Sequence, residues 1–458
     1  MKYDLREQKS KFNKEVLKEN MNISDIRAVN IKINGIIRDF EIVILPNEHA
    51  KARVTYEVPH LEYSEKDLFK LTEINAMYVC DDSILFSGKC QECSIKRDSI
   101  QKVDILNIKL ISHTIDLDKE KKSCSFQDCT MSYEQIMRQV LKKDERILNY
   151  QCEPIYGNAP LIQYHETAWE FIRRMASRMN TVIYPGYKES EPRISVGLRL
   201  PEEYQEMEVL ELKKVFCEVF WQRRDIDTNL RRDDFVGYDI TSYKDFDIGN
   251  GVVLENKKLF ILEKRMCFSN DEIIFHYRIG KLPMVVLHRY DNQKFSGMSV
   301  RGNVLSVTKE TVRLKFDFDK EQEIAKAYDY PWMPETGNAM YLMPQVGTIV
   351  HVYFKNAKEE SAVVINCVRE NGTIHGKLTN GNEKYLTDET GKQMFLKEKS
   401  LGFVNERTED GITVNDESPI LASSQKCISL VSAKNINLEA NTIYIETPNE
   451  VLGKKVRL

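Results

Sequence analysis

Short runs in which apolar and polar residues alternate dominate the first quarter of the chain. Val29, Ile31 and Ile33 alternate with polar neighbours, and the same pattern returns over residues 103–110 after polar turns. A period of two places the apolar side chains on one face of a strand. The segment from about residue 26 to 117 therefore predicts a β-barrel or a β-sandwich.

Two helices are predicted after this region because each begins with the spacing of a capping box. Ser132 and Gln135 predict a helix over residues 133–143, and Thr167, three residues before a Glu, predicts a second over residues 168–179. Each helix has one apolar face. These faces contain Tyr133, Ile136, Met137, Val140 and Leu141 in the first helix, and Ala168, Phe171, Ile172, Met175 and Met179 in the second.

Alternating runs continue after the second helix and become strict between residues 297 and 371. The runs up to about Val285 predict a second β-rich unit on which this helix packs. Farther on, Gly347 marks a turn and one long loop spans residues 319–341, so four or five short strands are typical of a small OB-like barrel. Its predicted core consists of Val312, Leu314, Phe316, Val350, Val352 and Phe354.

Apolar residues recur every eight positions near the end of the sequence. Fixed-period self-similarity is a stronger fold signal than local propensity. The two series are Ile412, Ile420, Ile428 and Ile436, and, two positions later in each octad, Val414, Ala422, Leu430 and Leu438.

One copy of this octad segment has too little apolar surface to fold alone. Eight buried side chains contribute on the order of 10 kcal/mol, against about 1–2 kcal/mol per residue for ordering some 35 residues. Three chains wound about one axis form the smallest closed prism, in which each stripe faces inward and each strand edge is paired. The octads therefore predict a trimeric stem; the alternative is a solitary β-meander packed on the barrel.

The composition of the chain argues against binding to nucleic acid or anionic lipid and against a membrane span. The 458 residues are 42% hydrophobic and 30% charged, with a formal net charge of −4, so no global field favours nucleic acid or anionic lipid. The first twenty residues are charged throughout and no apolar run reaches the length of a membrane span. We therefore expect synthesis in the cytoplasm without a signal peptide.

The ten cysteines fit reduced thiols better than a disulfide scaffold. Cys90, Cys93, Cys124 and Cys129 offer four thiolates, but their spacing is loose for tetrahedral zinc, so idle or buried thiols are favoured. No metal or other cofactor is predicted.

Four motifs in order resemble the hub-and-spike proteins of contractile injection machines: VgrG of type VI secretion and the baseplate hub and spike of contractile phage tails and phage-like particles. SCSFQDCTMSYEQIMRQVL and QYHETAWEFIRRMASRMN resemble hub segments. PQVGTIVHVYF, which contains Pro344 and Gly347, and SAVVINCVRENG resemble the barrel motif, and LTDETGKQMFL resembles the strand that opens the stem. The sequence departs from the family at Cys367, where Gly is frequent.

The resemblance implies a mainly β fold with a few helices. It implies hub β-barrel domains over residues 1–150 and 151–290, an OB-like barrel over 291–371, and a triple-stranded β-helix stem with a tip-binding end over 372–458. It also implies a homotrimer that docks on an inner tube protein and other baseplate proteins. Its stem binds a PAAR-like tip protein or cargo, and contacts a target membrane transiently when the sheath contracts.

An enzyme is the first alternative, as a β-helical carbohydrate-active protein with paired carboxylates. Asp225, Asp227, Asp233 and Asp234 are interleaved with arginines, which favours a salt-bridged loop or interface over a glycosidase pair. The sequence has no GxSxG, HExxH or P-loop motif. His165 lies just outside the second helix, and a structural or surface role is favoured over a catalytic one. We therefore predict no catalytic residues.

An OB-fold binding protein is the second alternative. Binding of single-stranded nucleic acid needs aromatic and basic residues on one barrel face. Phe316 and Phe318 alternate inward with the core, and Arg313 and Lys315 alone make a weak basic patch.

Overall fold

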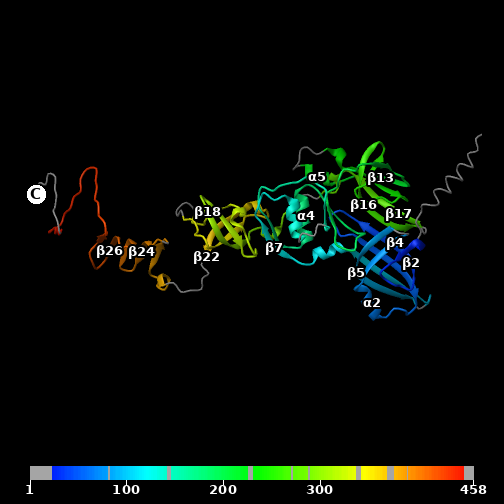
Figure 1. Ribbon diagram of the computed structural model, residues 1–458, viewed down its shortest axis with the longest axis horizontal. Helices are drawn as coiled ribbons and strands as arrows, with labels where there is room; N and C mark the ends of the chain where they lie inside the picture. The colour runs from blue at the N-terminus through cyan, green and yellow to red at the C-terminus, as the bar shows by residue number, and fades with distance from the viewer. Residues whose placement is uncertain are drawn as a thin grey trace, which may run out of the picture. The chain divides into compact units, whose positions relative to one another are not determined.

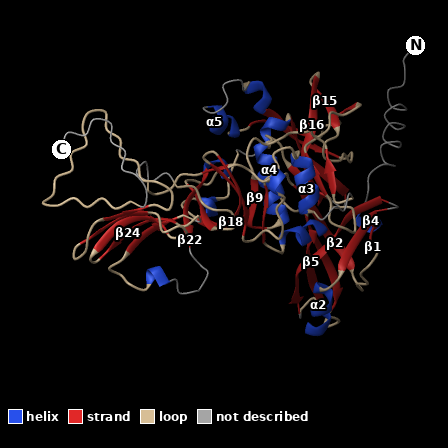
Figure 2. Ribbon diagram, turned by 60° about the vertical axis from the view of Figure 1, so that its left-hand side comes forward, coloured by secondary structure: helices blue, strands red, loops and turns tan. Residues whose placement is uncertain are grey.

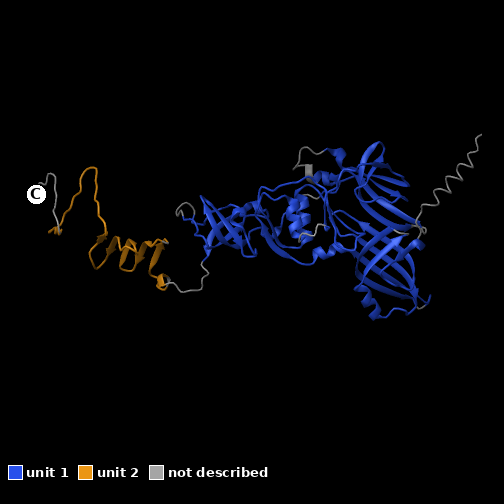
Figure 3. Cartoon of the chain, viewed as in Figure 1, with its two compact units in different colours: residues 1–369 blue, residues 370–458 orange. Residues whose placement is uncertain are grey.

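A computed structural model describes most of the chain and divides it into two compact units. Unit 1 spans residues 1–369 and unit 2 spans residues 370–458 (Figure 3). The described residues are 23–80, 83–98, 100–141, 146–224, 231–269, 272–286, 289–336, 342–368, 376–388 and 390–447.

Unit 1 is built around a curled sheet of twelve strands (Figure 1). Its main path runs β1-β4-β5-β6-β3-β2-β16-β17-β14-β13, with β15 beside β16 and β12 beside β15. The strands are β1 Ile26–Ala28, β2 Ile36–Ile44, β3 Lys51–Pro59, β4 Asn75–Cys80, β5 Ser83–Asp98, β6 Val103–Ser112, β12 Tyr204–Glu206, β13 Glu211–Phe216, β14 Val236–Ser242, β15 Gly251–Leu254, β16 Lys257–Ser269 and β17 Glu272–Gly280.

The alternating pattern of the sequence explains the two faces of this sheet. In β3, Ala52, Val54, Tyr56 and Val58 are buried while their neighbours are not. Strands from both predicted hub domains share the sheet, because β2 pairs with β16 through Ile42–Ile44 (Figure 2). One apolar core cluster therefore serves both halves, and the boundary at residue 150 stays a prediction.

Four α-helices are described: α2 Glu65–Thr72, α3 Tyr133–Val140, α4 Ala168–Arg178 and α5 Val219–Arg224. Both predicted capping boxes are confirmed, with Gln135 N–H donating to Ser132 Oγ at 3.3 Å and Thr167 making the same contact for α4. The helices end earlier than predicted, at Val140 and Arg178. Residues 142 and 143 of the first prediction lie outside the described residues.

A second core surrounds α4 and contains the apolar faces of α3 and α4. Two small sheets accompany these helices, one of which pairs β7 with β9 and the other of which has the order β10-β11-β8. Their strands are β7 Lys122–Phe126, β8 Leu148–Tyr150, β9 Leu161–Glu166, β10 Ile183–Pro185 and β11 Ile194–Val196.

The last part of unit 1 is a five-stranded sheet of order β20-β19-β18-β21-β22. A parallel bridge from Trp332 to Val364 and the 2.8 Å bond from Met333 N–H to the Val364 carbonyl join its two ends. The two-residue strand β20 lies inside the stretch predicted as a long loop, where so short a run has no alternation to detect. The strands are β18 Ser299–Thr308, β19 Thr311–Phe316, β20 Tyr330–Pro331, β21 Ile349–Phe354 and β22 Ala362–Val368.

Unit 2 contains an antiparallel meander of five strands in sequence order. Residues 424–447 follow it without a strand. The meander consists of β23 Lys384–Thr387, β24 Lys392–Lys397, β25 Ser400–Asn405, β26 Gly411–Asn415 and β27 Leu421–Ser423.

Candidate interchain interface

Unit 2 has almost no core of its own. Among its described residues, Phe395, at 7% exposure, is the single buried hydrophobic side chain. A large set of its apolar side chains is exposed instead. The exposed set is Leu386, Met394, Leu396, Leu401, Phe403, Ile412, Ile420, Leu421, Ile428, Leu430, Val431, Ile436, Leu438, Ile443, Tyr444 and Ile445.

The strand register collects the exposed apolar side chains of β23 to β26 on one face of the meander. Residues directly opposite one another in neighbouring strands project to the same side of a sheet. One such row crosses all five strands, and we call the face that carries it the apolar face. The row is Leu386, Met394, Phe403, Ile412 and Ala422.

Part of the opposite face of the meander is covered by its own chain. The Phe395 ring lies over Gly402, where an added Cβ would come within 2.8 Å of two ring carbons. Lys397 lies over the Phe395 ring at 5.0 Å from its centroid, and Lys377 forms a 2.9 Å ion pair with Glu406. Leu421 of β27 is exposed on this face, but most of the exposed apolar side chains of the described strands of unit 2 lie on the apolar face.

The structure places the eight predicted stem residues in two settings. Ile412 and Val414 lie in β26, Ala422 lies in β27 and Ile420 just precedes it, and strand parity assigns all four to the apolar face. The second setting is the stretch without strands, which holds the later octads. The four residues in this stretch are Ile428, Leu430, Ile436 and Leu438. Seven of the eight predicted stem side chains are exposed, and Val414 is half-buried.

An apolar face of this extent is chemically suited to association with another protein surface. Monomeric soluble proteins rarely leave a continuous apolar patch larger than a few hundred Å² in water. A stretch without a strand ladder also leaves backbone N–H and C=O groups available to a neighbouring chain. Unit 2 therefore exposes apolar side chains and backbone groups of the kind that association with another chain would use.

The predicted barrel residues lie in unit 1. All six predicted core side chains have 0% exposure and belong to one apolar cluster: Val312, Leu314, Phe316, Val350, Val352 and Phe354. Pro344 is buried, and Gly347 has φ +85°, with its N–H donating to the Val304 carbonyl at 2.8 Å. A positive φ at this turn explains the Gly in the barrel motif.

A buried charge cluster, which the sequence pattern did not reveal, connects α4 to this sheet. Arg174 donates to Glu166 at 2.8 Å and to Glu359 at 2.7 Å, and Arg178 bonds both Glu359 and Asp291. Glu359 begins the short 3-10 turn Glu359–Ser361 before β22. One feature of the sequence could have indicated this cluster. Arg174 stands beside the apolar positions of α4, and buried positions of a helix are usually occupied by apolar side chains.

Arginine charges hold the central carboxylate of this cluster ionised. Burial by itself would raise the pKa of Glu359, but Arg174 and Arg178 outweigh burial and lower it below its usual value. The buried ion pair between Arg174 and Glu359 therefore connects α4 to the five-stranded sheet within unit 1.

Those candidate catalytic and metal residues that the structure describes do not form one cluster. Asp225 and Asp227 lie outside the described residues, and Asp234 pairs with Lys281 at 2.6 Å. Asp233 is exposed, and so is His165, whose φ of +47° and backbone carbonyl bonded to Lys294 point to a role in the turn before α4.

The four cysteines considered for zinc lie in three places, and Cys129 is in the turn before α3. Cys90 and Cys93 are in β5 and Cys124 is in β7, and no group of metal-ligating side chains forms within the described ranges. Burial raises the pKa of the Cys93 and Cys124 thiols to about 11, so both are protonated at neutral pH.

The predicted basic patch on the barrel is largely neutralised. Arg313 donates two hydrogen bonds to the Asp329 carboxylate, at 2.8 and 3.0 Å.

Among the helices that the structure describes, none is long and apolar enough to cross a bilayer.

Several solved protein structures are similar in fold to this chain. An E. coli protein, c3393, matches with a TM-score of 0.55 and 12% identity, over 75% of this chain and 99% of its own. It is described as a component of the type VI secretion system with structural similarity to the T4 bacteriophage tail proteins gp27 and gp5. A chain of the half-lidded Francisella PdpA–VgrG complex matches with a TM-score of 0.55 and 10% identity, over 91% of both chains.

This chain has the VgrG fold. The lidded form of the Francisella complex agrees, with a TM-score of 0.54 and 10% identity over 92% of this chain and 83% of the other. No protein-family model and no curated protein matches the sequence. The VgrG fold thus rests on structure, and because one fold serves several functions, function is argued separately.

Proposed function

We propose that this chain is a structural hub-and-spike subunit of a contractile injection machine. The observation that carries the proposal is the apolar face of unit 2, whose described residues bury one hydrophobic side chain and expose a row across all five strands. The VgrG fold over more than nine-tenths of the chain supports the same conclusion.

The apolar face is completed by two further copies in this proposal. Three meanders that turn Met394, Phe403 and Ile412 toward a common axis remove those side chains from water, at roughly 25 cal/mol for each Å² buried. The later octads, which lack a strand ladder in one chain, pair their edges with neighbouring chains and extend the stem as a triple-stranded β-helix. Such pairing suits a component that bears axial force.

Unit 1 forms the hub and the OB-like barrel of the spike. Its five-stranded sheet has the OB strand order, since β18 lies between β19 and β21 and the ends β20 and β22 meet in parallel. The hub docks on an inner tube and other baseplate proteins, and a PAAR-like tip protein or cargo binds the far end of the stem. The assembled spike leaves the cell with the apparatus and punctures the target envelope when the sheath contracts.

Light scattering of the purified full-length chain tests the proposal. A solution mass of three times 53.4 kDa is expected. A folded monomer with unit 2 protected from protease would refute it and would favour a meander that packs within one chain. Catalytic turnover on a polysaccharide, at a site that includes Asp233 or Asp234, would favour the enzyme instead.

A further inference from the structure

A chain of hydrogen-bonded side chains joins the turn between β2 and β3 to the 3-10 turn η2 (His113–Asp118) and to the start of α4. His49 Nδ1 lies 2.7 Å from Thr114 Oγ1, and His49 Nε2 lies 3.4 Å from Asp118 Oδ2. The Thr167 hydroxyl, at the N-cap of α4, donates to Asp118 Oδ1. One histidine side chain therefore connects three elements of unit 1, either directly or through Asp118.

The turn that carries His49 also lies at the junction of two cores. Asn47 N–H donates to the Ile183 carbonyl at 2.8 Å, and Ile183 N–H donates to Asn47 Oδ1 at 3.2 Å. The His49 ring lies against the indole of Trp169, with 4.2 Å between the ring centroids. Because Ile183 and Trp169 belong to the core around α4, loosening of this turn would weaken the attachment of the large sheet to that core.

The hydrogen-bond directions along this chain require a neutral imidazole. A carboxylate accepts and does not donate, so His49 Nε2 must carry the hydrogen that faces Asp118. In the neutral ring Nδ1 is then an acceptor, and Thr114 O–H donates to it. Ser112 O–H donates in turn to Thr114 Oγ1, at 2.7 Å. Each hydroxyl hydrogen of the chain thus has an acceptor.

Protonation of His49 reverses part of this order. Both ring nitrogens then donate, so Thr114 O–H can no longer point at Nδ1 and must turn to Ser112 Oγ. Thr114 is the partner that the described residues provide for the Ser112 hydroxyl, whose own hydrogen then has no acceptor. Both hydroxyl residues have 0% exposure, so bulk water cannot replace the lost hydrogen bond.

Charged groups act on the ring from every element packed against it. Asp118 of η2 favours a proton on His49, whereas Arg173 of α4 and Lys51 of β3 oppose one. Burial of the ring is the largest effect and holds the pKa of His49 below its usual 6.5. The stability contributed by the neutral ring is therefore present above about pH 6.5 and is lost as the pH falls through the lower folded-state pKa.

A cavity of about 220 Å³, which His49 lines, gives water access to the ring. The charged residues that line this cavity are themselves paired, so their net effect on the ring is small. The ion pairs are Lys51–Glu48 at 3.5 Å, Arg53–Glu41 at 3.3 Å and Lys109–Glu92 at 2.8 Å. A proton can therefore reach His49 without unfolding of unit 1.

We propose that His49 is a proton-sensitive contact: the neutral ring holds the β2–β3 turn to η2 and α4, and protonation loosens this junction. The inference concerns unit 1 alone and does not depend on the proposed spike function. It makes the attachment of the large sheet to the core around α4 tighter at neutral pH than in mild acid.

Tryptophan emission tests which group takes up the proton. The sequence has three tryptophans, and a charge on His49 would appear against one of them, Trp169. The emission of the full-length chain should change with a midpoint below pH 6.5, and Trp169→Phe should remove this change. His49→Gln, which cannot take up a proton, should remove it too. The matched variant His276→Gln should leave it in place, although burial also lowers the pKa of His276.

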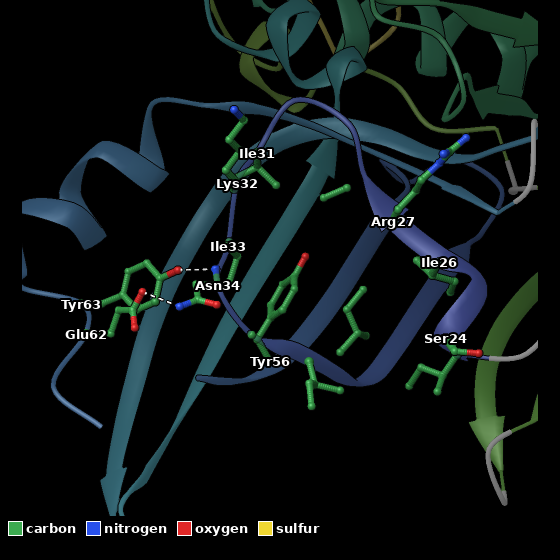
Figure 4. Close-up of a pocket in the computed structure, with 15 residues that line it drawn as sticks. Ser24, Ile26, Arg27, Ile31, Lys32, Ile33, Asn34, Tyr56, Glu62 and Tyr63 are labelled. Carbon is green, nitrogen blue, oxygen red and sulfur yellow. Dashed lines mark hydrogen bonds between the residues drawn. The ribbon is translucent and has the colours of Figure 1, made fainter. Parts of the chain in front are cut away.

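Hydrogen exchange tests the loosening itself. Protection factors, which correct for the intrinsic pH dependence of exchange, should fall at least about fivefold between about pH 7.5 and pH 5 in peptides over residues 112–118 and 165–170. A larger cavity, of about 760 Å³, provides the internal control, because the described residues that line it include no histidine (Figure 4). Peptides over residues 31–37, which line that cavity, should show no such fall.

Four results would overturn the proposal. An emission change that His49→Gln leaves in place assigns the proton to another group, and a midpoint at or above pH 6.5 shows that the chain of hydrogen bonds does not favour the neutral ring. Protection of residues 112–118 that is independent of pH excludes loosening, and an equal loss over residues 31–37 assigns it to general destabilisation by acid. If His49→Gln does not fold, the exchange of the unaltered chain and the emission of Trp169→Phe still decide.

Discussion

The Arg174 guanidinium and the Glu359 carboxylate lie 2.7 Å apart, with side-chain exposures of 1% and 0%. They are 185 residues apart in the sequence, one in α4 and the other before β22. A buried ion pair tolerates little movement, because separating the charges leaves each without water. This contact therefore fixes the position of the barrel sheet relative to α4 within unit 1.

Removing the carboxylate should destabilise unit 1 strongly. Glu359→Ala leaves Arg174 and Arg178 buried without their shared partner, which costs about 3–5 kcal/mol in free energy of unfolding. The adjacent Glu360, about half exposed and paired with Arg289, provides the control, and Glu360→Ala should cost less than about 1 kcal/mol. Urea unfolding measures both; equal costs would contradict the role assigned to Glu359.

The same pair predicts a pH dependence. Because the folded-state pKa of Glu359 is lowered from its usual 4.5, its contribution is present above that value and is lost as the pH falls through the lower folded pKa. The stability difference between the unaltered chain and Glu359→Gln should therefore be constant near neutral pH and shrink below about pH 4.5. A difference that grows on acidification would reverse the sign and exclude a lowered pKa.

Adjacent residues of β26 test the apolar face. Ile412→Asp places one carboxylate per chain on the proposed trimer axis and should lower the melting midpoint of the trimer by about 5 °C or more. Thr413→Asp adds the same charge on the opposite face and should change the midpoint little. Scanning calorimetry with light scattering compares them, and equal shifts would argue against an inward-facing row.

The later octads need a separate test because no strand pairs them in one chain. Ile428→Asp should disrupt their association and make residues 424–447 sensitive to protease, whereas Ser429→Asp should be tolerated. Limited proteolysis followed by mass spectrometry reads the outcome. If the unaltered segment is itself cleaved as fast as the Ile428→Asp variant, the octads do not form a stem.

Gly347 offers a test of the barrel turn. Nothing lies within 4 Å of an added Cβ, so Gly347→Ala should cost only the strain of φ +85°, about 1 kcal/mol. Gly376, in equally open space and without a positive φ, serves as the control for Gly→Ala itself. A loss above about 3 kcal/mol would show that the turn contacts a further surface.

Local patterns alone were enough to predict several parts of this chain. The capping boxes at Ser132 and Thr167 set the starts of α3 and α4 because their contacts join residues three apart. Alternation likewise separates Val312 and Leu314, which the structure buries, from their outward neighbours. The octad spacing indicated a segment with one apolar stripe and too little surface to bury alone.

Long-range contacts were decided by the tertiary structure. The join of β2 to β16, the pairing of β20 with β19 and the meeting of Arg174 with Glu359 each connect residues whose spacing has no periodic signature. Periodicity specifies which side of a strand is apolar, whereas the choice of neighbouring strand depends on the packing of the whole unit.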